Sequence, residues 1–190
     1  TDCVAGKMVT CLELRAAAVK AGLDAAFVPT GQTGIMIEGW GTSIDAVVSD
    51  FTGGAAEELV EQVKDRQICF IEGQGSLAHP CYSGVTLSLL HGTCPDVMIM
   101  CDQPGRTHYH DEMDCPIPPI EDQIRLCEMA AGVLHPAKVI GIAANTFGLS
   151  DAEASDSMKR LFARTGLPVC DPIRTGVEPL LSAIRSHFGI

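Results

Sequence analysis

Short apolar runs alternate with longer amphipathic stretches along the chain, and this alternation constrains the fold more than any other feature. Runs of strand length stand at 25–29, 68–71, 96–101, 138–144 and 167–170, and 44–48 is a short strand or a turn of helix. Apolar residues at helical spacing occur at 6–21, 54–64, 85–91, 120–131, 151–165 and 177–187, while 30–34 and 102–119 are polar loops. Repeated strand–helix alternation is typical of a parallel sheet with right-handed crossovers. We therefore predict an α/β fold, mainly a parallel sheet with helices on both faces.

The first residues, TDCVAGK, resemble a phosphate-binding loop that runs into a helix. The P-loop pattern is G-x-x-x-x-G-K-[ST], which Gly6 and Lys7 fit if a glycine precedes Thr1. In such a loop the backbone N–H groups point inward, the helix N-terminus adds positive potential, and the lysine contacts phosphate. We expect phosphate, nucleotide or CoA to bind at Thr1, Asp2, Cys3, Val4, Ala5, Gly6, Lys7 and Met8. Since a P-loop follows a strand, we also expect a longer protein in which that strand precedes Thr1.

Met8 is a departure from the pattern that bears on function. The Ser or Thr that normally follows the lysine holds Mg²⁺, and a thioether is a poor ligand for a hard cation. The loop is therefore expected to hold phosphate, with weakened support for hydrolysis of a magnesium–nucleotide complex.

Several polar residues follow the predicted strands, at the sheet edge where ligands bind in such folds. Glu72 comes directly after an apolar strand, which suggests a metal ligand or a general base, or a structural helix cap. His79 is a second candidate base or a hydrogen-bonded loop histidine. Asp50 is a second acidic group for a metal shared with Glu72, or a helix N-cap.

The remaining candidates lie in glycine-rich or polar loops. We expect substrate contacts from Thr30, Gln32, Thr33, Gly73, Gln74 and Gly75, and a nucleotide or CoA contact from Asn145. Arg106 is either a bidentate carboxylate clamp or a surface arginine. A cluster in THYHDEMDC offers metal-ligand types without a recognised spacing, so a solvated surface is favoured over a metal site; it comprises His108, His110, Asp111, Glu112 and Asp114.

Charge and cysteine content limit the function classes. The formal net charge is −11 and the 13 basic residues are scattered along the sequence, which argues against nucleic-acid and membrane-surface partners. Nine cysteines, an odd number without a C-x-x-C pair, favour free buried thiols in a reducing compartment over a disulfide framework. We expect a cytoplasmic protein with a small-molecule substrate, assembled as a homo-oligomer.

The chain also resembles a known family. The loop is distantly similar to that of dethiobiotin synthetases, which reads GTDT-x-VGKT. The segments TDCVAGKM, FVPTGQTGIMI, IDAVVSDFTGGAAEELV, IEGQGSLAHPCYSGVTLSLLHG and IAANT are more closely similar to the D-glutamate N-acetyltransferase-like family, across essentially all 190 residues. The resemblance implies that residues 1–190 are a C-terminal P-loop domain, with a smaller Rossmann-like N-terminal domain absent here. It implies acetyl transfer from acetyl-CoA to the amine of D-glutamate, without nucleotide hydrolysis.

Three functions therefore compete. The first is an N-acyltransferase acting on an acidic amino acid, with Glu72 or His79 as base. The second is a Mg·ATP-dependent ligase of dethiobiotin synthetase type, with Asp50 and Glu72 holding Mg²⁺. The third is a nucleotide-binding regulatory module. Met8 favours the first and third, and the two acidic groups with the GQG loop favour an enzyme.

Overall fold

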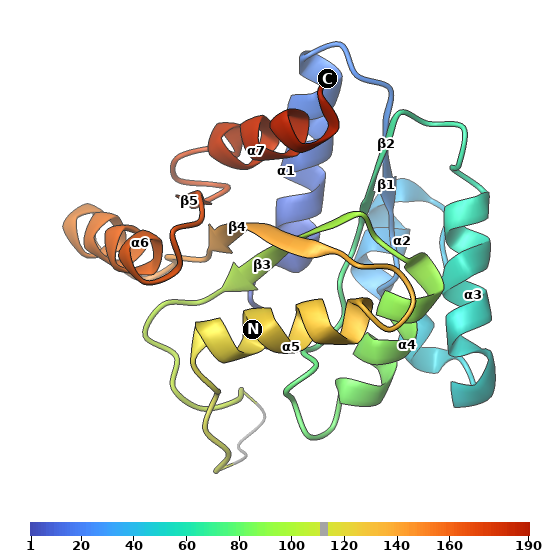
Figure 1. The fold of residues 1–190 in the computed structure, drawn as a ribbon, viewed down its shortest axis with the longest axis horizontal. Coiled ribbons are helices and arrows are strands. Elements are labelled where there is room, and N and C mark those ends of the chain that lie inside the picture. The colour runs from blue at the N-terminus through green and yellow to red at the C-terminus, as the bar shows by residue number, and fades with distance from the viewer. Residues whose placement is uncertain (111–113) are drawn as a thin grey trace.

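The computed structural model describes residues 1–110 and 114–190 and has parallel strands layered between helices (Figure 1). The first half contains α1 (Lys7–Lys20), β1 (Ala25–Val28), α2 (Gln32–Glu38), the 3₁₀ turn η1 (Ile44–Ala46), α3 (Ser49–Glu61) and β2 (Ile68–Ile71). The second half contains α4 (Ser83–Thr93), β3 (Val97–Asp102), α5 (Ile120–Ala131), β4 (Lys138–Ala144), α6 (Asp151–Thr165), β5 (Val169–Cys170) and α7 (Glu178–Phe188). The predicted α/β class is confirmed.

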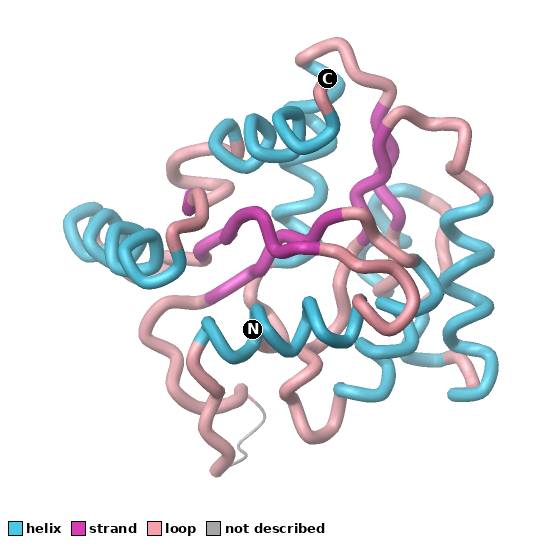
Figure 2. The backbone as a smooth tube through the Cα atoms, in the orientation of Figure 1, coloured by secondary structure: helices cyan, strands magenta, loops and turns pink. Residues whose placement is uncertain are grey.

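The strands of the described residues form two parallel sheets, β1–β2 and β3–β4–β5, which are the magenta segments of Figure 2. Val28 at the end of β1 is level with Ile71 at the end of β2, and Asp102 at the end of β3 is level with Ala144 of β4. Within each sheet the strands therefore end together, and the loops that follow them meet at a common edge.

Helices cover the sheets on both faces. On one face α1 and α7 pack together, and their buried Leu14 and Leu181 share a core with Phe70 of β2 and Cys101 of β3. A second core lies on the other face of β3–β4–β5, under α5 and α6, and a third lies under α3 and α4. Because α1 contacts residues of both sheets, the loop that begins this helix is held between them.

The structure corrects the sequence prediction at two segments. Helix α3 begins at Ser49, before the expected start at 54, and its N-cap residue is Val48 and not Asp50, which lies in the first turn. The second correction concerns the segment after β1. We expected a loop at 30–34, but helix α2 begins at Gln32. Its N-cap residue, Gly31, offers no side chain to accept a hydrogen bond. The Glu72 carboxylate, from a different part of the chain, accepts the N–H groups of Thr30 and Gly31 and so holds the backbone just before the helix. A tertiary contact of this kind leaves no local sequence signal.

The N-cap of α6, the cysteines and the helix lengths are simple to describe. Ser150 caps α6 in a capping box with Glu153, which stabilises a helix by about 1 kcal/mol. All nine cysteines are free thiols. Among the described residues no helix has both the length and the apolar character needed to cross a bilayer.

Candidate functional site

The first residues form a tight loop beside the end of β3 and then enter α1. The Thr1 hydroxyl donates a hydrogen bond of 2.8 Å to the Asp102 carboxylate. Gly6, the N-cap residue of α1, has a φ of 94°, in the left-handed region that glycine tolerates. The first N–H groups of a helix have no carbonyl partner within that helix. The loop therefore presents the positive end of α1 at the sheet edge.

Val4 adopts an unfavourable backbone conformation at the tip of this loop. Its φ is 58°, and its side chain is largely exposed. A positive φ is an outlier for a β-branched residue and costs of order 1–3 kcal/mol. Strain of this kind is concentrated at ligand-binding loops, which makes this loop a candidate binding site.

Lys7 folds back across the loop. Its Nζ donates a 2.6 Å hydrogen bond to the Asp2 carbonyl. A Cβ at position 73 would lie 3.1 Å from Lys7 Cδ, so Gly73 leaves room for this side chain. Burial lowers the pKa of Lys7 below its ordinary value of 10.5, although nearby acidic groups, including Asp2 and Glu72, oppose the shift. An anion in the loop would add a charged partner to the neutral Asp2 carbonyl that this ammonium already contacts.

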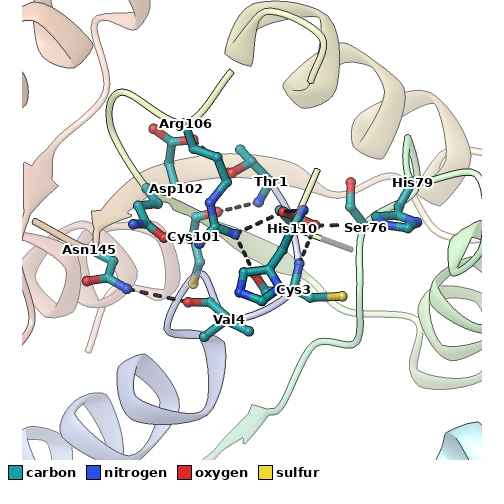
Figure 3. Close-up of polar contacts among 12 residues, drawn as sticks. Thr1, Cys3, Val4, Ser76, His79, Cys101, Asp102, Arg106, His110 and Asn145 are labelled. Carbon is teal, nitrogen blue, oxygen red and sulfur yellow. Dashed lines mark hydrogen bonds and ion pairs between the residues drawn. The ribbon is translucent and has the colours of Figure 1, made fainter. Parts of the chain in front are cut away.

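The Asp2 carboxylate holds the loop from inside, and it is fully buried (0% exposed). It accepts hydrogen bonds from the N–H of Cys3 at 2.6 Å, the N–H of His110 at 3.0 Å and the Arg106 guanidinium at 2.9 Å (Figure 3). The guanidinium also donates to the Cys3 carbonyl at 2.8 Å and to Gln103. Arg106 is therefore not a surface arginine, and its guanidinium is not free to bind a substrate carboxylate. Its contacts with Asp2 and Cys3 stabilise the P-loop.

His79 is also close to Asp2. Its side chain is 0% exposed, its Nδ1 accepts the Cys81 N–H at 3.1 Å, and its Nε2 lies 3.9 Å from Asp2 Oδ1. The rings of Tyr82 and Tyr109 lie against it, each with a centroid separation of 4.4 Å. This enclosure suits a histidine that orients the loop better than one that meets a bulky substrate directly.

Glu72 connects the exits of β1 and β2. Its Oε2 accepts the Thr30 and Gly31 N–H groups, both at 3.2 Å, while its Oε1 accepts no hydrogen bond from the described residues. The buried Thr30 hydroxyl donates to the Glu72 carbonyl at 2.7 Å and accepts from Gln74 at 2.8 Å. Small residues surround the carboxylate, since a Cβ at Gly34 would lie 2.6 Å from Oε2. Glu72 therefore fixes the backbone just before α2 and does not cap the helix itself, and its Oε1 stays open to a further hydrogen bond.

A polar cluster at the exits of β4 and β5 escaped the sequence analysis. Asp171 is buried and accepts hydrogen bonds from the N–H and hydroxyl of Thr146 and from the N–H groups of Ile173 and Arg174. Burial raises the pKa of this carboxyl, but those hydrogen bonds together hold it below its ordinary value. The available signal was an acidic residue directly after a strand, the same that singled out Glu72. Its neighbour Asn145 donates a 3.4 Å hydrogen bond to the Val4 carbonyl and so contacts the P-loop.

The other candidate residues have varied surroundings. Gln32 and Thr33 are exposed at the start of α2, Asp50 is exposed in the first turn of α3, and Met8 is partly buried in α1. Gly75 packs closely against Tyr82. His108 and Asp114 form an exposed ion pair at 3.8 Å, whereas Asp111 and Glu112 lie outside the described residues. In ranges 1–110 and 114–190 no group of three or more His, Cys, Asp or Glu side chains is arranged to hold a metal ion.

Comparison with known proteins identifies the family. Residues 1–181 match the model of a domain of unknown function, DUF1611_C, described as a P-loop domain. The chain belongs to the DUF1611 family. A crystal structure of a DUF1611 protein from Anabaena variabilis ATCC 29413 superposes with a TM-score of 0.92 at 42% identity, covering 96% of this chain and 54% of that one. The predicted P-loop fold is thereby confirmed.

Two curated relatives carry a functional name. Both are called D-glutamate N-acetyltransferase. The protein from a Pseudoalteromonas species is 41% identical over 183 residues, covering 96% of this chain and 55% of that protein. The protein from Tritonibacter scottomollicae is 41% identical over 187 residues, covering 98% and 56%. This DUF1611 chain thus spans about half the length of the curated relatives it matches.

Proposed function

We propose that this chain is the P-loop domain of an N-acetyltransferase that moves an acetyl group from acetyl-CoA to the amine of D-glutamate. The observation that carries the proposal is a strained loop that offers N–H groups and Lys7 to phosphate, followed by Met8 instead of a hydroxyl residue. The names of the two relatives support the same reaction.

The proposed chemistry fits a loop that binds phosphate without hydrolysing it. Acetyl-CoA carries a pyrophosphate and a 3′-phosphate, and a helix N-terminus binds either group. The deprotonated amine attacks the thioester carbonyl, the C–N bond forms, the C–S bond breaks and the CoA thiolate leaves. The substrate ammonium loses two protons in total, one to the leaving thiolate and one to a base. None of these steps needs a hydroxyl ligand for Mg²⁺ at position 8.

Glu72 is the base that the geometry favours. It lies beside the Lys7 side chain across Gly73, and its Oε1 accepts no hydrogen bond from the described residues. His79 is enclosed by two tyrosines and oriented toward Asp2, which suits a role in positioning the loop. In this proposal Glu72 takes the ammonium proton and His79 holds the phosphate loop in shape.

Calorimetric titration of the full-length protein tests the donor. We expect saturable binding of acetyl-CoA and of CoA in buffer with EDTA, and no gain when Mg²⁺ is added. The Met8→Thr variant restores the usual hydroxyl and is expected to keep acetyl transfer while gaining weak affinity for Mg·ATP. Tight binding of Mg·ATP by the unaltered protein, together with no binding of acetyl-CoA, would refute the proposal in favour of a ligase.

A further inference from the structure

A cavity lies next to the P-loop. It is a cleft of about 600 Å³ between the loop that leaves β3, the segment before α5 and one face of α6. We call it the arginine cleft, because its lining includes Arg106, Arg160 and Arg164. Its volume is within the range for small-molecule sites.

The grouping of three arginines in the arginine cleft is unexpected for this chain. Only 13 of 190 residues are basic, and the net charge is −11. All three arginines are also distant in sequence from the P-loop at residues 1–7. Folding places Arg106 of the β3 exit opposite two residues one helical turn apart on α6. Asp102 and Glu153 line the same cleft, so it offers both cationic and anionic contacts to a ligand.

The three arginines differ in how their charge is neutralised. Arg106 is paired with the buried Asp2, and Arg164 binds Glu121 through two hydrogen bonds, of 2.8 and 2.6 Å. Arg160 has only the neutral Ser157 hydroxyl, at 2.9 Å, and no acidic partner among residues 1–110 and 114–190. Its planar guanidinium is the group best suited to bind a carboxylate through two parallel hydrogen bonds.

Two acidic residues, Glu153 and Asp102, also line the cleft. Glu153 is committed to the N-cap of α6, where it accepts from the Ser150 backbone and hydroxyl. Within the described ranges the Asp102 carboxylate accepts a hydrogen bond only from the Thr1 hydroxyl, and it lies at the junction of the cleft and the P-loop. An ammonium group at this junction would face Asp102, with carboxylates of the same molecule directed toward α6.

We propose that the arginine cleft binds the acceptor amino acid, with Arg160 binding a carboxylate and Asp102 guiding the amine out of the cleft to the P-loop, where the donor and the proposed base Glu72 lie. This inference rests on the proposed function and specifies where its acidic substrate is held. An acidic amino acid, which carries two carboxylates and one amine, matches the charges that line the cleft.

Steady-state kinetics of the full-length protein test the assignment with a matched pair of variants. Arg160→Gln removes the unpaired guanidinium. Lys159→Gln removes the neighbouring charge of α6, which is exposed, is 3.7 Å from Asp156 and does not line the cleft. We expect Arg160→Gln to raise KM for D-glutamate by about 10- to 100-fold, the effect of losing a charged hydrogen-bonding partner, with KM for acetyl-CoA unchanged. Arg160→Lys should recover part of the loss, and Lys159→Gln should match the unaltered protein.

Direct titration of D-glutamate separates this inference from the proposed function. If no acetyl transfer occurs but D-glutamate binds the unaltered protein and not Arg160→Gln, the cleft assignment stands and the proposed function fails. If transfer occurs and KM for D-glutamate is the same in Arg160→Gln, the assignment is overturned. If Arg160→Gln instead raises KM for acetyl-CoA, the cleft binds the donor and the assignment is overturned. The assignment is also overturned if the unaltered protein neither transfers acetyl nor binds D-glutamate.

Discussion

Replacing the buried carboxylate inside the P-loop tests whether Asp2 holds the loop in shape. Asp2→Asn keeps the size of the side chain, removes its charge and places an amide NH₂ among three hydrogen-bond donors. Breaking a buried ion pair by removing one partner costs about 3–5 kcal/mol. Arg106 keeps two other acceptors, the Cys3 carbonyl and Gln103, which reduces the cost. We therefore expect the free energy of unfolding to fall by about 3 kcal/mol.

An exposed pair of the same chemistry provides the control. Asp24 pairs with Arg66 at 2.8 Å, but these side chains are 51% and 55% exposed. An exposed ion pair contributes about 0–1 kcal/mol, so Asp24→Asn should change stability little. Urea denaturation of the full-length protein, followed by circular dichroism, gives both differences. If Asp2→Asn lowers the free energy of unfolding no more than Asp24→Asn does, the buried Asp2 contacts do not stabilise the protein as argued, and the reasoning is wrong.

Three further predictions concern the same sheet edge. Lys7→Ala should weaken binding of CoA by about 1–3 kcal/mol, measured by calorimetry, because the loop loses its ammonium. Glu72→Gln should lower turnover by about 10²–10⁴ while acetyl-CoA binding is kept, as expected for loss of a general base. The pKa of Asp171 is lowered from 3.8 because its hydrogen bonds outweigh burial, so its stabilising contribution is full above about pH 4 and is lost as the pH falls below it. Acid unfolding of Asp171→Asn should therefore depend less steeply on pH below about pH 4.

Each of these has a result that contradicts it. Unchanged CoA affinity in Lys7→Ala would show that this loop does not bind a phosphate of CoA. If Glu72→Gln keeps the normal rate and His79→Gln loses it with the pH–rate profile altered, the base is His79. If Asp171→Asn unfolds with the same dependence on pH as the unaltered protein, protonation of Asp171 does not contribute to the loss of stability in acid.

Elements with their own boundary signals were predictable from sequence. The strands Ile68–Ile71 and Lys138–Ala144 and the helices Ile120–Ala131 and Asp151–Thr165 have the predicted bounds, because apolar periodicity and caps such as Ser150 are local. The edge residues Glu72 and Asn145 were found because strand ends in a parallel sheet converge. By contrast, α2 was missed, since its N-cap residue Gly31 has no side chain and the backbone before it is held by the distant Glu72 carboxylate.

The candidate site was only partly predictable for the same reason. The P-loop has a motif, but the enclosure of His79 by Tyr82 and Tyr109 depends on a contact between two separate loops. The basic residues look scattered in the sequence, and only the fold brings Arg106 into one cleft with Arg160 and Arg164. Local patterns predict elements and loop chemistry, whereas grouping of charges depends on tertiary packing.

The central claim is acetyl transfer on a P-loop that does not hydrolyse nucleotide. The most direct measurement mixes the full-length protein with acetyl-CoA and D-glutamate in EDTA and follows CoA thiol release and N-acetyl-D-glutamate by mass spectrometry. We expect equal amounts of the two products without ATP or Mg²⁺. If product forms only with Mg·ATP, in step with ADP release, the account is contradicted and the chain belongs to a ligase.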